Sequence, residues 1–471
     1  MKTIFSMLTL ALPEEPNPYN KLAMHLTTPT QRLRRSLLHT ATLLLLALAA
    51  GSPAAAAEPP ARKPNFIFIM TDDQSWGDLG CFGHPYAKTP NLDRMAAEGI
   101  KFTQYYSCAT ECAPARSALI TGRIPGKAGK PNNNAKRLDP GLPNFNKLLK
   151  SAGYTTGHFG KWHLYDGFKE PPDSERSQYH IDEWKIYGNG NVQSRIVDAT
   201  LDFLGRHKDA PFHVSIWFTW PHLGGTPDAK QLAVYDDVLD PAVPGKQVDI
   251  TRFHPTMQAK FNQIKQLYPQ YDLTGKMREY LAAVTDMDTQ IGRVLTKLDE
   301  LHLSQNTLVV FAGGDQGANA TITAQKPVEG GNTRMWAANA GPYRGGKFSY
   351  LEGNLRMSCL AQWKGRIKGG QVNDSLWRSV DWLPTACALA GVKTDDIALD
   401  GQNVSDIVLG AQRERSEPIF WQGAVREGRW KWIKGELYNL ETDPSEQNNL
   451  ASKYPERAQQ MKTLLQEWLK K

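Results

Sequence analysis

The chain contains three short stretches that are almost entirely apolar, at residues 66–70, 211–218 and 307–312. A short apolar run without polar alternation is typical of a strand that is buried on both faces of a sheet. Strands of this kind form parallel sheets that helices cover on both sides. We therefore expect an α/β fold in which a large mixed, mostly parallel sheet is sandwiched by helices.

Helical periodicity accounts for much of the sequence between these runs. The segment that begins at Thr89 is predicted to be a helix that ends at Gly99, and a short strand, Ile100–Tyr106, is expected after it. Polar stretches without clear periodicity are predicted to be loops between these elements. These loops lie at 165–194, 224–277 and 318–343, and further helices are predicted at 142–152, 191–206 and 276–300.

The C-terminal part of the chain has a different pattern. Short alternating stretches at 419–421 and 430–433 predict strands of a small antiparallel sheet, and residues 455–470 predict an amphipathic terminal helix. We therefore expect a main domain at 64–393 and a smaller C-terminal α+β subdomain at 394–471.

Residues 1–57 have the pattern of a signal peptide with an upstream extension. A basic segment, Gln31–Arg35, precedes the apolar run Leu43–Ala50, and small residues follow at Ala55–Ala57. The apolar run is too short to span a bilayer. We therefore expect an exported protein, periplasmic or secreted, without a stable membrane anchor.

Net charge changes this picture little. The formal charge is +7, and residues 1–57 hold five Lys or Arg and two Glu, so the remainder carries +4. This mild excess is compatible with an anionic substrate and does not indicate nucleic acid, which needs a concentrated basic patch.

Export would allow cysteines to pair, and spacing alone does not decide the pairing. The cysteines are Cys81, Cys108, Cys112, Cys359 and Cys387.

Polar side chains follow the apolar runs at the points where the predicted strands end. Asp72 and Asp73 follow the first run, and Asp315 and Gln316 follow the third. Adjacent carboxylates at a buried strand end are costly unless a cation lies between them. Oxygen ligands of this kind suit Ca²⁺ or Mg²⁺. A solvated turn would explain an isolated Asp-Asp pair equally well.

Cys112 is placed at the start of a predicted helix. Pro114 fits the first turn, and Gly122 can end the helix after Thr121. A helix N-terminus attracts anions, and Arg116, about one turn further on, adds a guanidinium suited to an oxyanion. A thiol of low pKa or a small buried apolar residue would also explain this cysteine by itself.

Three other side chains could handle charge or protons near such an anion. In extended chain Lys161 and His163 would point the same way, which combines charge neutralisation with a proton carrier. His222 follows the second apolar run, as the aspartates follow the first. His158 and His213 are expected to be core residues.

The segment 112–123, Cys-x-Pro-x-Arg followed by Leu119 and Thr-Gly-Arg, resembles the signature of the type I sulfatases of the alkaline phosphatase superfamily. The resemblance extends over residues 64–450. Where the family usually has Asn, this chain has Gln316, which is one methylene longer. The other matching segments, in the family's order, are Asp72–Asp73, Gly160–His163, Pro221–His222, Asp315–Gln316 and Arg344–Lys347.

The resemblance implies a specific cofactor chemistry. A formylglycine-generating maturation enzyme would oxidise Cys112 to Cα-formylglycine, an aldehyde that is hydrated in the resting enzyme. One divalent cation, Ca²⁺ or Mg²⁺ as the alternative, would be bound by the oxidised Cys112 side chain and by Asp72, Asp73, Asp315 and Gln316.

The resemblance also implies a role for each remaining site residue. Asp315 would be the base that assists attack on sulfur, and His222 would protonate the departing oxygen. His163 would then take the proton of the remaining hydroxyl. The cations that would bind the sulfate are Arg116, Lys161 and Lys347.

The expected activity is hydrolysis of a sulfate monoester, on a sulfated saccharide or small molecule. A phosphonate monoester or phosphodiester hydrolase of the same superfamily is one alternative. A secreted glycan-binding protein on an inactive sulfatase scaffold is another. Trp220 and Trp336 are possible platforms for stacking on a sugar ring.

Overall fold

The computed structural model describes residues 62–126, 137–165, 171–188, 190–222, 224–318 and 333–470. The chain divides into residues 1–61 and one compact unit, Arg62–Lys471, and the description below concerns this second unit. The predicted signal peptide at 1–57 lies outside the described residues.

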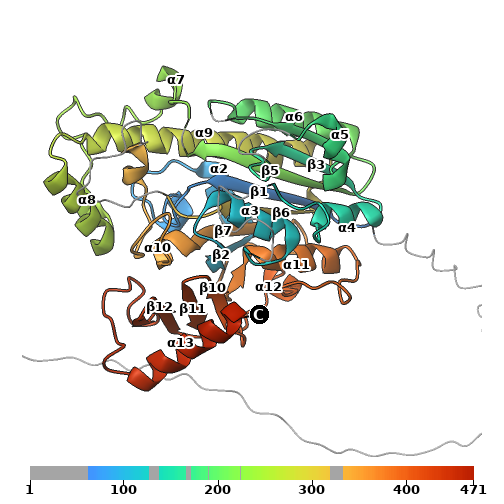
Figure 1. Cartoon of the computed structure of the whole chain (residues 1–471). Coiled ribbons are helices and arrows are strands. Elements are labelled where there is room, and N and C mark those ends of the chain that lie inside the picture. The colour runs from blue at the N-terminus through green and yellow to red at the C-terminus, as the bar shows by residue number, and fades with distance from the viewer. Residues whose placement is uncertain are drawn as a thin grey trace, which may run out of the picture. The chain divides into compact units, whose positions relative to one another are not determined.

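In the described residues, nine strands form one mixed sheet, which confirms the predicted fold class (Figure 1). Most neighbours are parallel, and β7 is antiparallel to both of its neighbours, β6 and β2. In spatial order the strands are β4 (Glu183–Ile186), β3 (Thr155–Gly160), β5 (Phe212–Pro221), β1 (Asn65–Asp72), β6 (Thr307–Gly313), β7 (Arg356–Gln362), β2 (Ile100–Tyr106) and β8 (Gln371–Asn373), with β9 (Trp377–Arg378) also beside β2.

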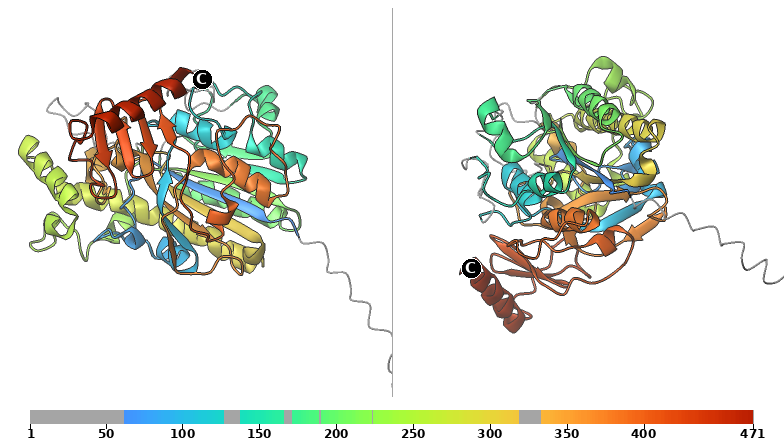
Figure 2. Two further views of the ribbon diagram at one scale, coloured as in Figure 1. Left: turned by 90° about the horizontal axis from the view of Figure 1, so that it is seen from below. Right: turned by 90° about the vertical axis from the view of Figure 1, so that its right-hand side faces the viewer.

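Side chains of the central strand β1 enter two separate cores because they alternate between the faces of the sheet. Ile67 and Ile69 belong to one core, and Phe66 and Phe68 belong to the other. Both faces are therefore apolar, as the uninterrupted run predicted. Figures 1 and 2 show helices on each side of the sheet: α2 (Pro90–Glu98), α6 (Gln193–Arg206) and α9 (Leu273–Glu300) contribute to the first core, and α3 (Cys112–Thr121), α4 (Phe145–Ser151) and α11 (Trp382–Leu389) to the second.

All three predicted loops contain regular structure, so those predictions are wrong in part. Residues 318–343 include the 3₁₀ helix Thr333–Ala337, and their part 319–332 lies outside the described residues. Residues 224–277 include α7 (Ala229–Ala233) and α8 (Pro255–Leu267), and residues 165–194 include α5 (Asp173–Arg176) and strand β4. The apolar stripe of α8 is narrow, with few buried positions among many polar ones. A narrow stripe gives weak periodicity, which is why the sequence pattern did not reveal the helix.

A second, antiparallel sheet and the helix α13 (Pro455–Lys470) form the C-terminal part of the unit, as predicted. Within residues 394–470 four strands build this sheet, and Met461 and Leu465 of α13 pack against Val425 and Leu437 of its strands. The strands are β10 (Ile419–Trp421), β11 (Ala424–Glu427), β12 (Trp430–Ile433) and β13 (Glu436–Asn439), and the remaining short helices are α10 (Glu352–Leu355) and α12 (Ser405–Val408).

All five cysteines lie in the described residues, and none forms a disulfide. Across the described ranges, no helix combines the length and the apolar character needed to span a bilayer.

Candidate active site

The predicted site residues meet at the carboxyl ends of four adjacent strands, in the order β3, β5, β1 and β6. Lys161 follows β3 directly, and His222 follows β5. Asp72 ends β1, and Asp315 comes just after β6. Because these strands are parallel, their carboxyl ends share one edge of the sheet, where sites of open α/β folds lie.

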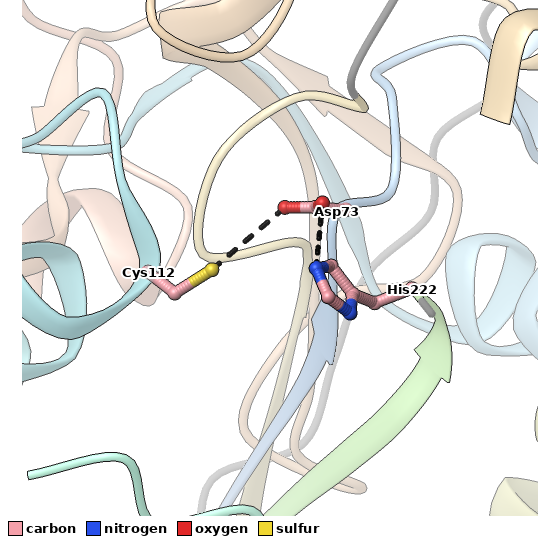
Figure 3. A group of neighbouring side chains, drawn as sticks. All are labelled: Asp73, Cys112 and His222. Atoms are coloured by element: carbon pink, nitrogen blue, oxygen red, sulfur yellow. Dashed lines mark hydrogen bonds and ion pairs between the residues drawn. The ribbon is translucent and has the colours of Figure 1, made fainter. Parts of the chain in front are cut away.

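Cys112 faces this edge from the first residue of α3. Its Sγ lies 3.6 Å from Asp72 Oδ1 and 3.9 Å from Asp73 Oδ1. Figure 3 shows the Asp73 carboxylate between Cys112 and His222, whose Nε2 is 3.3 Å from Asp73 Oδ2. Four potential ligand atoms, one each from Asp72, Asp73, Cys112 and Asp315, all lie within 4.8 Å of one another.

The local sequence fixes the position of Cys112. Glu111 is extended and α3 begins at the next residue, with Pro114 in the first turn, as expected. Gly122 ends the helix with a φ of 63°, a conformation that glycine adopts without strain. The whole of α3 is buried, and Cys112 is only 1% exposed.

Three buried cations surround the carboxylates. Each makes its shortest contact with a different aspartate, and Arg116 Nη2 also lies 3.5 Å from Asp72 Oδ1. Lys347 lies 3.3 Å from Cys112 Sγ as well. Arg116 also donates to the carbonyl of Lys161 at 3.1 Å, which links two of the cations. The pairs are Lys161 Nζ with Asp72 Oδ2 at 2.5 Å, Lys347 Nζ with Asp73 Oδ2 at 2.8 Å, and Arg116 Nε with Asp315 Oδ2 at 2.8 Å.

The aspartates differ in acidity. Burial raises the pKa of Asp315 to about 6, with Arg116 acting in the opposite direction. Burial would also raise the pKa of Asp72, but Lys161 and the other nearby cations outweigh it and hold that pKa far below its ordinary value. One carboxyl of the cluster is therefore a strong permanent anion, and another is suited to exchanging protons near neutral pH.

Cys112 does not have the character of a reactive thiolate. Burial raises the pKa of its thiol to about 12, Asp315 adds to the effect, and Lys161 and Lys347 oppose it. The alternative of a low-pKa thiol at a helix end is therefore wrong for the unmodified side chain, because the surrounding carboxylates and the loss of water outweigh the helix N-terminus.

The donor set fits a hard divalent cation. Three buried carboxylates converge, and oxygen is the ligand that Ca²⁺ and Mg²⁺ prefer. The amide of Gln316 contacts Asp73 Oδ1, and its nitrogen lies 3.3 Å from Cys112 Sγ. Its Oε1 is buried and has no hydrogen-bond partner among the described residues. A half-turn of the Gln316 amide exchanges the positions of its nitrogen and its oxygen, and the two atoms are distinguished only by such contacts. After this turn the oxygen would face the cluster.

His222 joins the cluster through its backbone as well as its ring. Its N–H donates to the carbonyl of Asp72 at 3.1 Å. Burial lowers the pKa of His222, although Asp72 and Asp73 oppose this shift. The side chain remains 12% exposed, so it lies between the buried carboxylates and solvent.

The geometry predicted for His163 is wrong. Strand β3 ends at Gly160, and His163 has a φ of 55°, so the two-residue repeat that would align it with Lys161 does not apply. His163 is buried, and it is not part of either ligand group found in the described residues. His158 and His213 are buried within the fold, as predicted.

Both tryptophans predicted as possible sugar platforms are buried. Trp220 is 0% exposed, and its Nε1 donates to the carbonyl of Gly224. Trp336 packs against the rings of Tyr268 and Tyr271. Neither ring can therefore stack on a ligand in this conformation, and that prediction is wrong.

Sequence reasoning missed two residues that support the site. Arg334 donates to the carbonyl of His222 at 2.7 Å and to that of Gly225 at 2.8 Å, so it holds the turn after β5. Ser107 Oγ donates to the carbonyl of Asp315 at 2.5 Å. No local motif marks either residue, because each contact joins segments that are far apart in sequence.

The comparisons with known proteins agree with this geometry. A family model described as Sulfatase matches residues 64–392. Human N-acetylgalactosamine-6-sulfatase is 33% identical over 394 residues, which cover 76% of this chain and 68% of the relative. Human arylsulfatase A is 30% identical over 478 residues and covers 89% of each chain.

Solved structures share the fold. Ps i-CgsB in complex with k-i-k-neocarrahexaose has a TM-score of 0.68 at 23% identity, covering 86% of this chain and 93% of that one. A structure in complex with D-glucosamine-2-N,6-O-disulfate has a TM-score of 0.66 at 22% identity, covering 87% and 98%. Identities this low establish the fold alone. On the family match and the curated relatives, the chain belongs to the sulfatase family, whose members are sulfuric ester hydrolases.

Proposed function

We propose that the chain hydrolyses a sulfate monoester of a saccharide to the alcohol and inorganic sulfate. The observation that carries this proposal is the position of Cys112. Its side chain lies among three carboxylates and within 3.3 Å of the Lys347 ammonium, at the edge where four strands end. Cys112 is thus the natural nucleophile position, provided that it is chemically activated.

Oxidation of Cys112 to Cα-formylglycine is the proposed activation. A thiol with a pKa of about 12 is a poor nucleophile at neutral pH. The hydrated aldehyde supplies two hydroxyls on one carbon, one to attack sulfur and one to drive release of sulfate. The proposal therefore requires a formylglycine-generating maturation enzyme as a partner.

The cations would neutralise the sulfate oxygens. Lys347 touches both Asp73 and Cys112 Sγ, so its ammonium faces the atom from which the nucleophile would derive. Arg116 and Lys161 add positive charge, and their ion pairs also orient Asp315 and Asp72. Fixed positive charge in a buried site stabilises the developing charge of the transition state.

Proton transfers are assigned to three residues. Asp315, with a pKa of about 6, is suited to accept the proton of the attacking hydroxyl near neutral pH. His222 lies at the edge of the cluster, 3.3 Å from Asp73, and is proposed to protonate the departing alcohol oxygen. His163 is proposed to accept the proton of the second hydroxyl.

One divalent cation is proposed to complete the site, held by Asp72, Asp73, Asp315, Gln316 and the oxidised Cys112 side chain. Ca²⁺ is preferred because these protein ligands are all oxygen, and Mg²⁺ would fit the same chemistry. When bound, the cation supplies positive charge next to the sulfate. The buried Oε1 of Gln316 and the three converging carboxylates support this assignment.

A sulfated saccharide is the proposed substrate class. The relatives include proteins named N-acetylgalactosamine-6-sulfatase, and one structural neighbour was solved with D-glucosamine-2-N,6-O-disulfate. The predicted signal peptide supports export to the periplasm or the medium. Residues 64–393 are proposed as the catalytic domain and 394–471 as the C-terminal subdomain. The end of the family match at residue 392 supports this boundary.

The test combines mass spectrometry with a substrate panel. The protein is produced with a maturation enzyme, and the Cys112 peptide should carry an aldehyde in place of the thiol. The active protein should then release sulfate from sulfated saccharides and nitrophenyl sulfate, and Cys112→Ala should remove this activity while the protein stays folded. An unmodified thiol in fully active protein would contradict the formylglycine assignment. Faster cleavage of a phosphodiester would favour the alternative hydrolase. A phosphonate monoester hydrolase of Agrobacterium radiobacter shares the fold of this chain at a TM-score of 0.62.

A further inference from the structure

The loop that presents Lys347 is fastened at both ends to one turn of the C-terminal subdomain. We define the Lys347 loop as residues 344–352. At its start, Arg344 Nε donates to the carbonyl of Ser445 at 3.2 Å, and Arg344 Nη2 donates to the carbonyl of Glu446. At its end, the N–H of Glu352 donates to Glu446 Oε2 at 2.7 Å.

A buried lysine binds the two carboxylates together. Lys431 Nζ lies 2.8 Å from Glu352 Oε1 and 2.9 Å from Glu446 Oε1, and these three residues are 0% exposed. The second oxygen of Glu352 accepts from Tyr106 at 2.5 Å and from Arg356 at 2.8 Å. Loss of one partner from such a group leaves an uncompensated buried charge, so its geometry is strongly constrained.

The loop between these anchors is closed by its own backbone. The N–H of Gly353 donates to the carbonyl of Arg344 at 2.8 Å. Gly345 has a φ of 91°, and a Cβ there would lie 2.6 Å from Leu351. The N–H of Lys347 donates to the carbonyl of Ala318 at 3.1 Å. The N–H of Phe348 donates to the carbonyl of Thr110 at 3.2 Å. The Lys347 ammonium is therefore positioned by the two held ends of the loop together with these contacts at its middle.

Glu446 has an unusual backbone for a non-glycine residue. Its φ is 54°, in the left-handed region that side chains other than glycine rarely adopt. Its N–H donates to the carbonyl of Asp443 at 3.1 Å, and its carboxylate and carbonyl both contact the Lys347 loop or Lys431. A strained residue persists where surrounding contacts over-determine its conformation.

We infer that Glu446 and Lys431 are positioning residues for Lys347, so that the C-terminal subdomain completes the active site. Neither residue contacts Cys112 or the aspartates at the strand ends. They act by fixing the ends of the Lys347 loop, and thereby the contacts of the Lys347 ammonium with Asp73 and Cys112. This inference rests on the proposed function, in which Lys347 binds the sulfate.

Glu446→Gln tests the inference, because it keeps the shape of the side chain and removes the charge that holds Lys431. With nitrophenyl sulfate we expect kcat/KM to fall about tenfold. In a Lys347→Ala background the same substitution should cause no further loss, since the effect acts through Lys347. An equal loss in both backgrounds, or no loss in folded Glu446→Gln, would overturn the inference.

Glu427→Gln is the matched control. Glu427 pairs with Arg457 inside the C-terminal subdomain, away from the Lys347 loop. The Glu427→Gln substitution should lower the melting temperature slightly and leave kcat/KM unchanged. If Glu446→Gln does not fold, Arg344→Met replaces it in the same cycle. This change removes the donors to the carbonyls of Ser445 and Glu446 and to the hydroxyl of Tyr438, and it keeps Lys431 and both buried carboxylates.

A separate readout distinguishes this inference from the proposed function. If the wild-type protein releases no sulfate from any ester, the proposed function fails. The positioning role is then read from crystal structures of the wild type and Glu446→Gln. Displacement of the Lys347 ammonium from Asp73 in the variant supports the role, and an unchanged contact rejects it.

Discussion

At the scale of single residues, Gln316 illustrates how the site tolerates a departure from its family's pattern. The side chain is one methylene longer than the asparagine expected there. Its amide still lies within the cluster and contacts both Asp73 and Cys112. The turn before Gln316 needs glycine, since Gly314 has a φ of 108° and a Cβ there would lie 2.7 Å from backbone oxygens of Gln74 and Gln316. The backbone is therefore tightly packed at the strand end from which Gln316 reaches the cluster.

His222→Ala should separate substrates by the quality of their leaving groups. Without the proposed acid, sulfates of sugars or alkyl alcohols should slow by about 10²–10⁴-fold, because their alkoxides need a proton to depart. Nitrophenyl sulfate should slow much less, since its leaving group is a stable anion. Steady-state kcat/KM for the two substrate types gives the answer, and equal losses would remove His222 from the role of acid.

The site residues at strand ends were predictable because each follows a strong local signal. Asp72, His222 and Asp315 lie within four residues of the end of an apolar run, and parallel strands bring such positions to one edge. Arg334 and Glu446 could not be found in this way. Their partners lie more than ninety residues away or in another sheet, and single-sequence patterns carry no information on such pairings.

At the scale of elements, α2 begins against α9 instead of being capped locally. Thr89, the residue before α2, does not cap the helix backbone with its side chain, which instead donates to Asp93 Oδ1 at 3.0 Å. Instead, Asp288 of α9 accepts from the N–H of Leu92 at 2.7 Å and from that of Asn91 at 3.2 Å. Gly292 lies one turn further along α9 and leaves room for the Asn91 side chain. A Cβ at position 292 would lie 2.5 Å from that side chain.

This contact should give stability a specific pH dependence. Burial raises the pKa of Asp288 from 3.8 to about 6, although the hydrogen bonds from Leu92 and Asn91 oppose the shift. The folded state therefore binds more protons than the unfolded state between these values, and the contribution of Asp288 to the free energy of unfolding falls as pH rises through this range.

Asp288→Ala should therefore lower the melting temperature more at about pH 4.5 than at about pH 7, with the cost differing by about 1–2 kcal/mol. Calorimetry at both pH values measures the difference. Asp198→Ala is the control, because Asp198 is exposed and pairs with Arg293 of α9, and its effect should be small at both pH values. A larger cost for Asp288→Ala at pH 7 would contradict the prediction.

Among the elements, the buried strands were the most predictable and the short polar ones the least. A strand such as β1 has no polar face, so its pattern is distinctive without any tertiary context. Strand β13 and helix α8 owe their structure to neighbours: Leu437 packs on α13, and Phe261 on the first core of the main sheet. Their own apolar residues are too few to predict them.

At the scale of the whole described unit, a small apolar cluster, separate from the two cores of the main sheet, joins the two sheets. Tyr106 and Leu355 of the main sheet region pack in one cluster with Trp421 and Tyr438 of the C-terminal sheet. Trp421 Nε1 also donates to the carbonyl of Ser107 at 2.9 Å. The buried Lys431 group lies in the same region, so separation of the sheets would expose both apolar and charged side chains.

Residues 394–471 should therefore not unfold independently of the main domain. We expect a single calorimetric transition in which loss of sulfatase activity coincides with loss of the C-terminal sheet. A chain that ends at residue 393 should be insoluble or inactive, because Tyr106 and Leu355 lose their cover. Two separate transitions, with activity retained after the first, would contradict this view.

The depth of Cys112 also bears on how the enzyme is made. At 1% exposure in the first turn of α3, and 3.3 Å from the Lys347 ammonium, the sulfur is not accessible to another protein in this conformation. The proposed oxidation must then occur while this part of the chain is still extended, during or soon after synthesis. Production hosts would accordingly have to supply the oxidising activity ahead of folding, and no later treatment of the finished molecule could replace it.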